Sequence, residues 1–323
     1  MFRFRRALAL TAVSLLALSA CGDDDVDPSS EPAGESTTPT LASPETTPAS
    51  GPPATTPSSD VPSPDGLPTK IISLSPSSTE ILYAIGAGDQ VIAVDSQSNY
   101  PPESESKKTD LSGYEPNVEA IAAYEPNLVV HDGTTDLGSQ LDALGIPHFA
   151  GLAPEDFDDV YVQIEQTGAV TGHAAEAAEL VAQMQIDVDA AIADVAEPEV
   201  PLTYYHEVDN TYFSVNSNTF IAQVYGLFGM RNSADTAEST TPYPQLSAEF
   251  IISQNPDMIF LGDADYGESA ETVGARPGWD VISAVANNAV VPVSADISSR
   301  WGPRVVEFIQ IVSTAIETAT VPA

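Results

Sequence analysis

Short apolar runs rich in β-branched residues recur along the chain and alternate with segments of helical periodicity. The runs predict strands at 70–75, 90–95, 127–132, 201–206, 257–262 and 289–294. The intervening patterns predict helices at 78–85, 118–124, 220–228 and 304–316. Strands that alternate with helices favour an α/β fold whose sheets are mainly parallel.

The longest helical pattern lies in the middle of the chain, at 173–195. It is rich in Ala, Glu, Leu and Gln, has no internal Gly or Pro, and ends before Pro198. A helix of this length would extend over about 35 Å. Two interpretations stay open: a strut that joins two α/β halves, or an ordinary packing helix.

Two similar segments lie on either side of this helix. In both "NVEAIAAYEPNLVVHD" (117–132) and "LSAEFIISQNPDMIFLGD" (246–263), a glutamate is followed seven residues later by a proline and then by a strand pattern. The glutamates, Glu119 and Glu249, begin short amphipathic helices that Pro126 and Pro256 end. Either the two carboxylates only favour the helix N-termini, or they form a matched pair that meets two cations on a partner.

The first residues have the pattern of a secretory signal peptide. Arg3, Arg5 and Arg6 precede an apolar stretch at 7–20, which as a helix would span about 20 Å and not the ~30 Å of a membrane. "LSAC" at 18–21 resembles a bacterial lipobox, so we expect Cys21, the single cysteine, to be lipidated. The alternative is a stray cysteine in an ordinary signal peptide, and the export route (general secretory or twin-arginine) stays open.

Residues 22–69 are dominated by Pro, Ser, Thr, Asp and Glu and contain few apolar residues. Such a composition predicts a disordered spacer between the membrane and a globular head. The predicted organisation is a signal peptide (1–20), a lipidated cysteine with its linker (21–69), a first lobe (70–165), a connecting helix region (166–197) and a second lobe (198–323).

Charge narrows the classes of partner. The chain has 47 acidic and 10 basic residues, a formal net charge of −37. Such a surface repels nucleic acid, so we expect no nucleic-acid partner. Against this background "RWGPR" (300–304) brings together Arg300, Trp301 and Arg304.

Four segments resemble one family in the same order: 70–102, 117–130, 243–261 and 299–304. It is the family of substrate-binding proteins of ABC importers for vitamin B12 and iron–siderophore complexes, and the likeness is closest to its cobalamin-binding members. The resemblance implies two similar α/β lobes joined by one long interdomain helix, with the ligand cleft between the lobes. It also implies a monomer without enzymatic activity or resident cofactor. Such a protein would be held on the outer face of the cytoplasmic membrane by its lipid, and would deliver a cobalt or iron chelate to an ABC permease.

The resemblance also implies site residues. Glu119 and Glu249 would dock on the permease, while Tyr100, Tyr114, Phe213, Tyr243 and Arg300 would contact the ligand. Trp301 joins them because aromatic rings bury the flat faces of a chelate well. For each aromatic residue the alternative is packing in the core, and for Arg300 it is an ion pair with a nearby acid. We expect Arg304 to be structural.

Other functions have less support. An extracellular hydrolase would need a G-x-S-x-G elbow or an HExxH motif, and neither occurs. A surface sensor with the same fold stays open as an alternative. The four histidines are not spaced for chelation, so we expect no metal site; an axial contact to haem or cobalt from His131 or His206 is left open. The scarcity of basic residues favours a corrinoid, haem or hydroxamate chelate over a catecholate.

Overall fold

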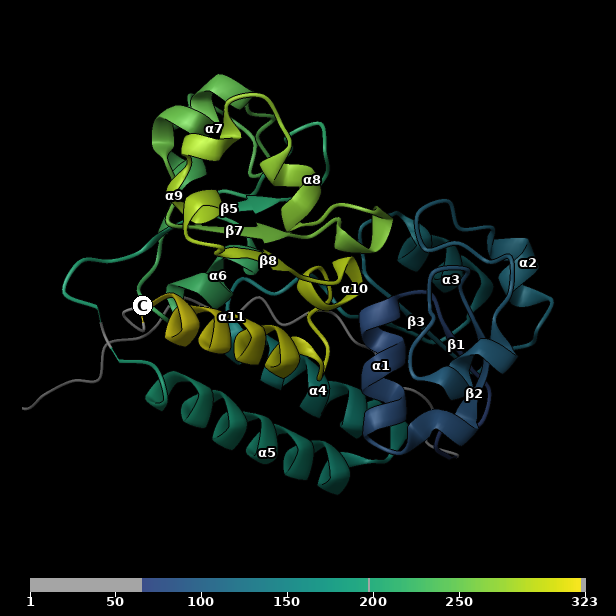
Figure 1. Cartoon of the computed structure of the whole chain (residues 1–323). Helices are drawn as coiled ribbons and strands as arrows, with labels where there is room; N and C mark the ends of the chain where they lie inside the picture. The colour runs from purple at the N-terminus through teal and green to yellow at the C-terminus, as the bar shows by residue number, and fades with distance from the viewer. Residues whose placement is uncertain (1–65, 197, 321–323) are drawn as a thin grey trace, which may run out of the picture. The chain divides into compact units, whose positions relative to one another are not determined.

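The computed structural model describes residues 66–196 and 198–320. The predicted signal peptide, Cys21 and most of the predicted spacer lie outside the described residues. The described part contains two sheets, each with four parallel strands (Figure 1).

The two sheets have the same strand order. The first is ordered β2-β1-β3-β4 and the second β6-β5-β7-β8, and all pairings are parallel. This confirms the prediction of two similar α/β lobes. The strands are β1 (Ile71–Ser73), β2 (Val91–Val94), β3 (Leu128–His131), β4 (His148–Ala150), β5 (Thr203–Glu207), β6 (Arg231–Asn232), β7 (Met258–Leu261) and β8 (Val290–Pro292).

Helices follow the strands in both lobes, and polar side chains cap many of them. The Ser75 hydroxyl accepts a hydrogen bond at the start of α1, and Asn117 and Ser247 do the same for α2 and α7. The helices of the lobes are α1 (Pro76–Ala84), α2 (Val118–Ala122), α3 (Leu137–Leu144), α6 (Phe220–Gly226), α7 (Ala248–Gln254), α8 (Ala270–Gly274), α9 (Ser283–Ala286), α10 (Ala295–Ser298) and α11 (Val305–Thr320).

The connection between the two sheets contains two helices. They are α4 (Phe157–Thr171) and α5 (Ala174–Ala193), and the chain turns between them at Gly172, whose φ of +85° favours glycine. The predicted long helix is α5, within two residues at each end. α4 begins inside the segment predicted as first lobe, because its Gly168 and two threonines weaken the helical pattern in the sequence.

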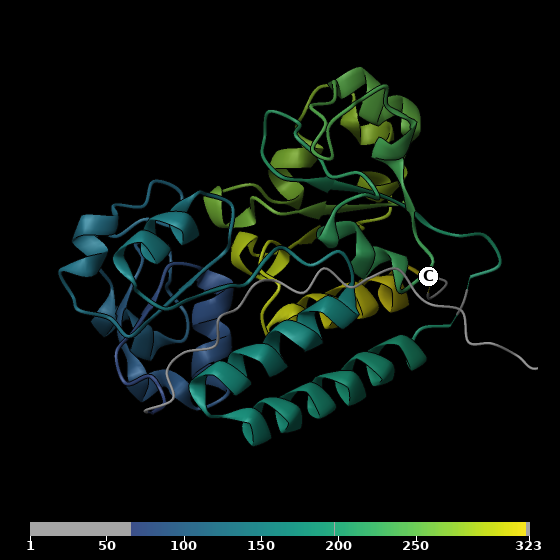
Figure 2. The ribbon, with the colours of Figure 1, turned by 180° about the vertical axis from the view of Figure 1, so that it is seen from behind.

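α5 reaches from the first lobe to the second. His173, at its start, lies against Gly86 of the first lobe, and near its end the Ala191 carbonyl accepts a hydrogen bond from Ser313 of α11. Figures 1 and 2 show α5 running beside α4, and α11 also packs on α5. This is the strut interpretation of the sequence pattern.

The main hydrophobic core is continuous through these helices. It includes Ile71 and Leu82 in the first lobe, Val181 and Val188 on α5, and Phe260 in the second lobe, all buried. A second, smaller cluster fills the other face of the first sheet. The lobes are therefore joined by shared apolar packing as well as by the chain.

Candidate ligand-binding site

A cavity of about 320 Å³ lies at the carboxyl ends of the strands of the second lobe. Open parallel sheets bind their ligands at this edge. Its walls come from the second lobe, from the segment before α4 and from the turn before α11. The lining residues used below are Pro154, His206, Tyr243, Gly262, Ser299 and Trp301.

Two of the predicted ligand residues, Tyr243 and Trp301, are brought together in this cavity. Trp301 is half-buried, and its indole N–H donates to Oε1 of Gln163 on α4 at 3.1 Å. This bond fixes the ring between the second lobe and α4. Tyr243 is 48% exposed, so it is not a core residue.

The other predicted aromatic residues are also exposed. Tyr114 is 75%, Tyr100 40% and Phe213 36% accessible, which excludes the core-packing alternative for them. Tyr100 and Tyr114 lie in the connection from β2 to α2, and Phe213 lies in the connection from β5 to α6. These connections all leave the carboxyl ends of strands.

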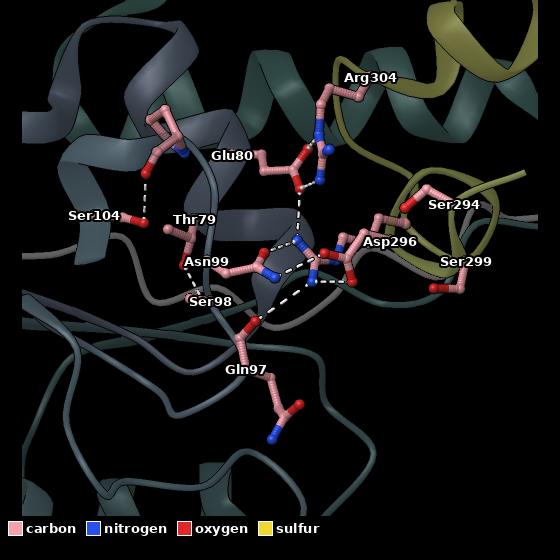
Figure 3. A network of polar contacts seen from close by, with 12 residues as sticks. Thr79, Glu80, Gln97, Ser98, Asn99, Ser104, Ser294, Asp296, Ser299 and Arg304 are labelled. Atoms are coloured by element: carbon pink, nitrogen blue, oxygen red, sulfur yellow. Dashed lines mark hydrogen bonds and ion pairs between the residues drawn. The ribbon is translucent and has the colours of Figure 1, made fainter. Parts of the chain in front are cut away.

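Arg300 is engaged by the protein itself. It is 8% exposed, and its guanidinium donates to Glu80 (3.0 Å), Asn99 (2.8 Å), Asp296 (2.6 Å) and, at 3.4 Å, to the Gln97 carbonyl (Figure 3). This is the ion-pair alternative left open by the sequence. Arg300 is held in this ion pair because the carboxylate of Glu80 is buried and enclosed by the two lobes.

Arg304 binds the same carboxylate. Its Nε donates to Oε2 of Glu80 at 2.9 Å, and its guanidinium stacks on the ring of Tyr100, 4.1 Å from the centroid. The structural role predicted for Arg304 agrees with this geometry. We call Glu80, Asn99, Asp296, Arg300 and Arg304 the inter-lobe clasp.

Reasoning from the sequence missed Glu80, the carboxylate that accepts the hydrogen bonds of the clasp. Glu80 is one carboxylate among many in an acidic chain, and its partners lie 220 and 224 residues away. A weak signal was present in the helix pattern, because Glu80 stands between Thr79 and Ile81 on a helix whose centre is buried.

His131 is part of a hydrogen-bonded chain in the first lobe. Its Nδ1 accepts from the N–H of Gly133, and its Nε2 lies 3.1 Å from Nδ1 of His148. Burial and the neighbouring His148 lower the pKa of His131 to about 4. Both ring nitrogens have protein partners, which leaves neither free for an axial contact.

His206 is placed differently, at the wall of the cavity. Its Nδ1 lies 2.7 Å from the hydroxyl of Tyr225, and burial lowers the pKa of His206 to about 4.

Within residues 66–196 and 198–320, no group of three or more His, Cys, Asp or Glu side chains converges as a metal site.

Glu119 and Glu249 occupy equivalent positions. Each is exposed and is the second residue of its helix, α2 before β3 and α7 before β7. Figure 1 shows α2 and α7 on the side of their lobes away from α5. Neither carboxylate has a hydrogen bond or ion pair to another described side chain.

A second, larger groove of about 660 Å³ lies between β8 and α11. No aromatic side chain lines it, and it is away from the strand ends that carry the exposed tyrosines.

Among the described helices, none is both long enough and apolar enough to cross a membrane.

The fold and the cavity define a two-lobed binding protein. The comparisons agree: the family model described as "Periplasmic binding protein" matches residues 71–296, and the chain belongs to this family. A cobalamin-binding protein of Halobacterium salinarum is 32% identical over 269 residues, which cover 80% of this chain and 72% of that protein.

Two further relatives extend the likeness. An uncharacterised ABC transporter substrate-binding lipoprotein of Bacillus subtilis, YvrC, is 31% identical over 263 residues, 77% of this chain and 80% of that protein. The solved structure of the periplasmic vitamin B12-binding protein BtuF of Vibrio cholerae matches with a TM-score of 0.66 and 26% identity, covering 79% of this chain and 99% of that one.

Proposed function

We propose that this protein is the extracytoplasmic substrate-binding component of an ABC importer and that its ligand is a corrinoid. The observation that carries the proposal is the set of exposed aromatic side chains at the strand ends: Tyr100, Tyr114, Phe213 and Tyr243. Solvent-exposed rings on both lobes suit the flat apolar faces of a macrocycle. The relatives named for cobalamin support the same ligand.

Charge supports a corrinoid over a strongly anionic chelate. The two arginines nearest the cavity, Arg300 and Arg304, are occupied by the carboxylate of Glu80. A ligand with several negative groups would need free cations, whereas the amide side chains of a corrinoid need only hydrogen-bond partners. The cavity of about 320 Å³ would take part of the ligand, and the exposed rings would cover the rest.

A direct test is calorimetric titration of the purified full chain with cyanocobalamin, ferric haem and a ferric hydroxamate. The proposal expects cyanocobalamin to bind with a Kd below roughly 10 µM, a binding free energy of about −7 kcal/mol. Tighter binding of haem or of the hydroxamate would show that this chelate, and not the corrinoid, is the ligand. No binding of any chelate would contradict the transport function.

The permease contact rests on Glu119 and Glu249. Two exposed carboxylates that pair with no other described side chain, at matched places in the two lobes, suit two cations on a permease. In this proposal the glutamates act in delivery and make no contact with the ligand.

The membrane anchor rests on Cys21. The lipobox-like "LSAC" and the lipoprotein named among the relatives support acylation of this cysteine on the outer face of the membrane. Mass spectrometry of the mature chain tests this directly: an acylated Cys21 at the N-terminus is expected. An unmodified cysteine, or a chain that still begins at Met1, would contradict the anchor.

A further inference from the structure

His206 presents one ring nitrogen to the cavity. It is the fourth residue of β5, it is 1% exposed, and it lines the cavity with Gly262 at the end of β7. A methyl group at position 262 would lie 2.9 Å from Nε2 of His206. Glycine at 262 therefore leaves Nε2 uncovered on the cavity side, and no described residue forms a hydrogen bond with it.

The other ring nitrogen is fixed by Tyr225. The Tyr225 hydroxyl lies 2.7 Å from Nδ1 of His206 and has no other polar partner among the described residues. Tyr225 is fully buried between the rings of Tyr204, Phe260 and Phe308. Burial raises the pKa of Tyr225 well above its usual value, so the hydroxyl keeps its proton.

The direction of this hydrogen bond decides the tautomer of His206. A buried hydroxyl proton without an acceptor is unfavourable, and among the described residues Nδ1 is the single acceptor within reach. The Tyr225 O–H therefore donates to Nδ1, which must be unprotonated. Since burial keeps the imidazole neutral, its one proton lies on Nε2 and points at the cavity.

We propose that His206 donates a hydrogen bond from Nε2 to a carbonyl oxygen of the bound ligand, and that it does not coordinate the metal of the chelate. The inference rests on the proposed function, where the carbonyl would belong to a side-chain amide of the corrinoid. The sequence left open an axial contact from His206 to the metal, and this inference excludes that contact.

Coordination would require the opposite tautomer. A metal binds the lone pair of an unprotonated nitrogen, so the proton of His206 would have to move to Nδ1. Nδ1–H would then face the Tyr225 oxygen, and the hydroxyl proton would be buried with no acceptor. The cost of that arrangement favours hydrogen-bond donation.

Two corrinoids separate donation from coordination. Both axial positions of the cobalt are filled in cyanocobalamin, whereas aquacobalamin carries an exchangeable water. A donating His206 predicts that His206→Leu weakens the binding of both by a similar factor, about tenfold, and that His206→Gln, which keeps an N–H donor, retains more affinity. It also predicts no ligand-exchange change in the absorption of bound aquacobalamin. A preference for aquacobalamin that disappears in His206→Leu would overturn the inference.

Nuclear magnetic resonance of the full chain labelled with ¹⁵N-histidine gives a readout that needs no ligand. The inference expects the Nε2–H tautomer for His206 in the wild type and a loss of this preference in Tyr225→Phe. An Nδ1–H tautomer in the wild type overturns it. If the tautomer is as expected and neither corrinoid binds, the proposed function fails, and donation to a corrinoid fails with it. If both corrinoids bind His206→Leu as tightly as the wild type, only the inference fails.

Discussion

Arg300 and Glu80 form a buried ion pair across the two lobes, with Nη1 of Arg300 3.0 Å from Oε1 of Glu80. Glu80 comes from α1 in the first lobe, and Arg300 from the turn before α11 in the second. Arg304 binds the same carboxylate, and Gly302 between the two arginines lets the chain approach α1 closely: a methyl group there would lie 3.3 Å from Glu80 Oε2. The basic segment of this acidic chain thus holds the lobes together.

Removal of Arg300 should destabilise the protein more than removal of any exposed arginine. Arg300→Ala leaves Asp296 without its cation and removes one of the two guanidinium groups that hold the buried Glu80, and breaking a buried ion pair in this way costs about 3 kcal/mol of unfolding free energy. Urea unfolding of the full chain measures the loss. Arg231→Ala is the matched control, because Arg231 is exposed and no described side chain pairs with it. Equal stabilities of the two variants would show that the clasp contributes nothing.

Asp263 should make stability depend on pH in an unusual direction. It is buried, neither of its carboxylate oxygens has a hydrogen-bond partner among the described residues, and burial together with Glu207 raises its pKa to about 6. The folded state therefore holds this proton more tightly than the unfolded chain does. The contribution of Asp263 to stability is present below about pH 4 and is lost as the pH rises to about 6.

Asp263→Asn tests this because it removes the charge and keeps the shape. At pH 7 the variant should be more stable than the wild type by about 1–3 kcal/mol, and the difference should shrink toward pH 4. Unfolding of both proteins in urea at the two pH values gives the comparison. A variant that is less stable at pH 7, or a difference independent of pH, would show that Asp263 is not destabilised by its charge.

The two glutamates should affect transport without affecting binding. Glu119→Ala combined with Glu249→Ala is expected to leave the Kd for cyanocobalamin unchanged, because both side chains are exposed on helices away from the cavity lining. Uptake of labelled cyanocobalamin by cells that depend on this protein should be lost. The control pair, Glu165→Ala with Glu179→Ala, removes the same charge from α4 and α5. Reduced affinity with normal uptake would reverse the assigned roles.

The sequence predicted the elements whose pattern is local. Strands such as β3 and β7 are continuous apolar runs. In the repeat, α7 ends at Gln254, just before Pro256 as expected, whereas α2 already ends at Ala122, well before Pro126. β4 and β6 escaped prediction because neither contains a β-branched apolar run: β4 is His148–Ala150 and β6 is the polar pair Arg231–Asn232. Their pairing with neighbouring strands is a tertiary effect.

The sequence supports a choice of residue types for the proposed site, which stays a prediction, and it does not predict their arrangement. Exposure separates Tyr114 and Tyr243 from the core tyrosines Tyr204 and Tyr225, although all four look alike in the sequence. Arg300 and its partner Glu80 are 220 residues apart in the sequence, and the tautomer of His206 depends on a contact with a residue 19 positions away. No local pattern encodes either contact.

Quenching of tryptophan fluorescence by cyanocobalamin tests most directly whether a corrinoid binds in this cavity. The chain has two tryptophans: Trp301 lines the cavity and Trp279 is fully buried in the second lobe. Corrinoid binding in this cavity predicts saturable quenching with a Kd below roughly 10 µM, with most of the change lost in Trp301→Phe and kept in Trp279→Phe. Absence of saturable quenching in the wild type, or quenching that survives unchanged in Trp301→Phe, would contradict it.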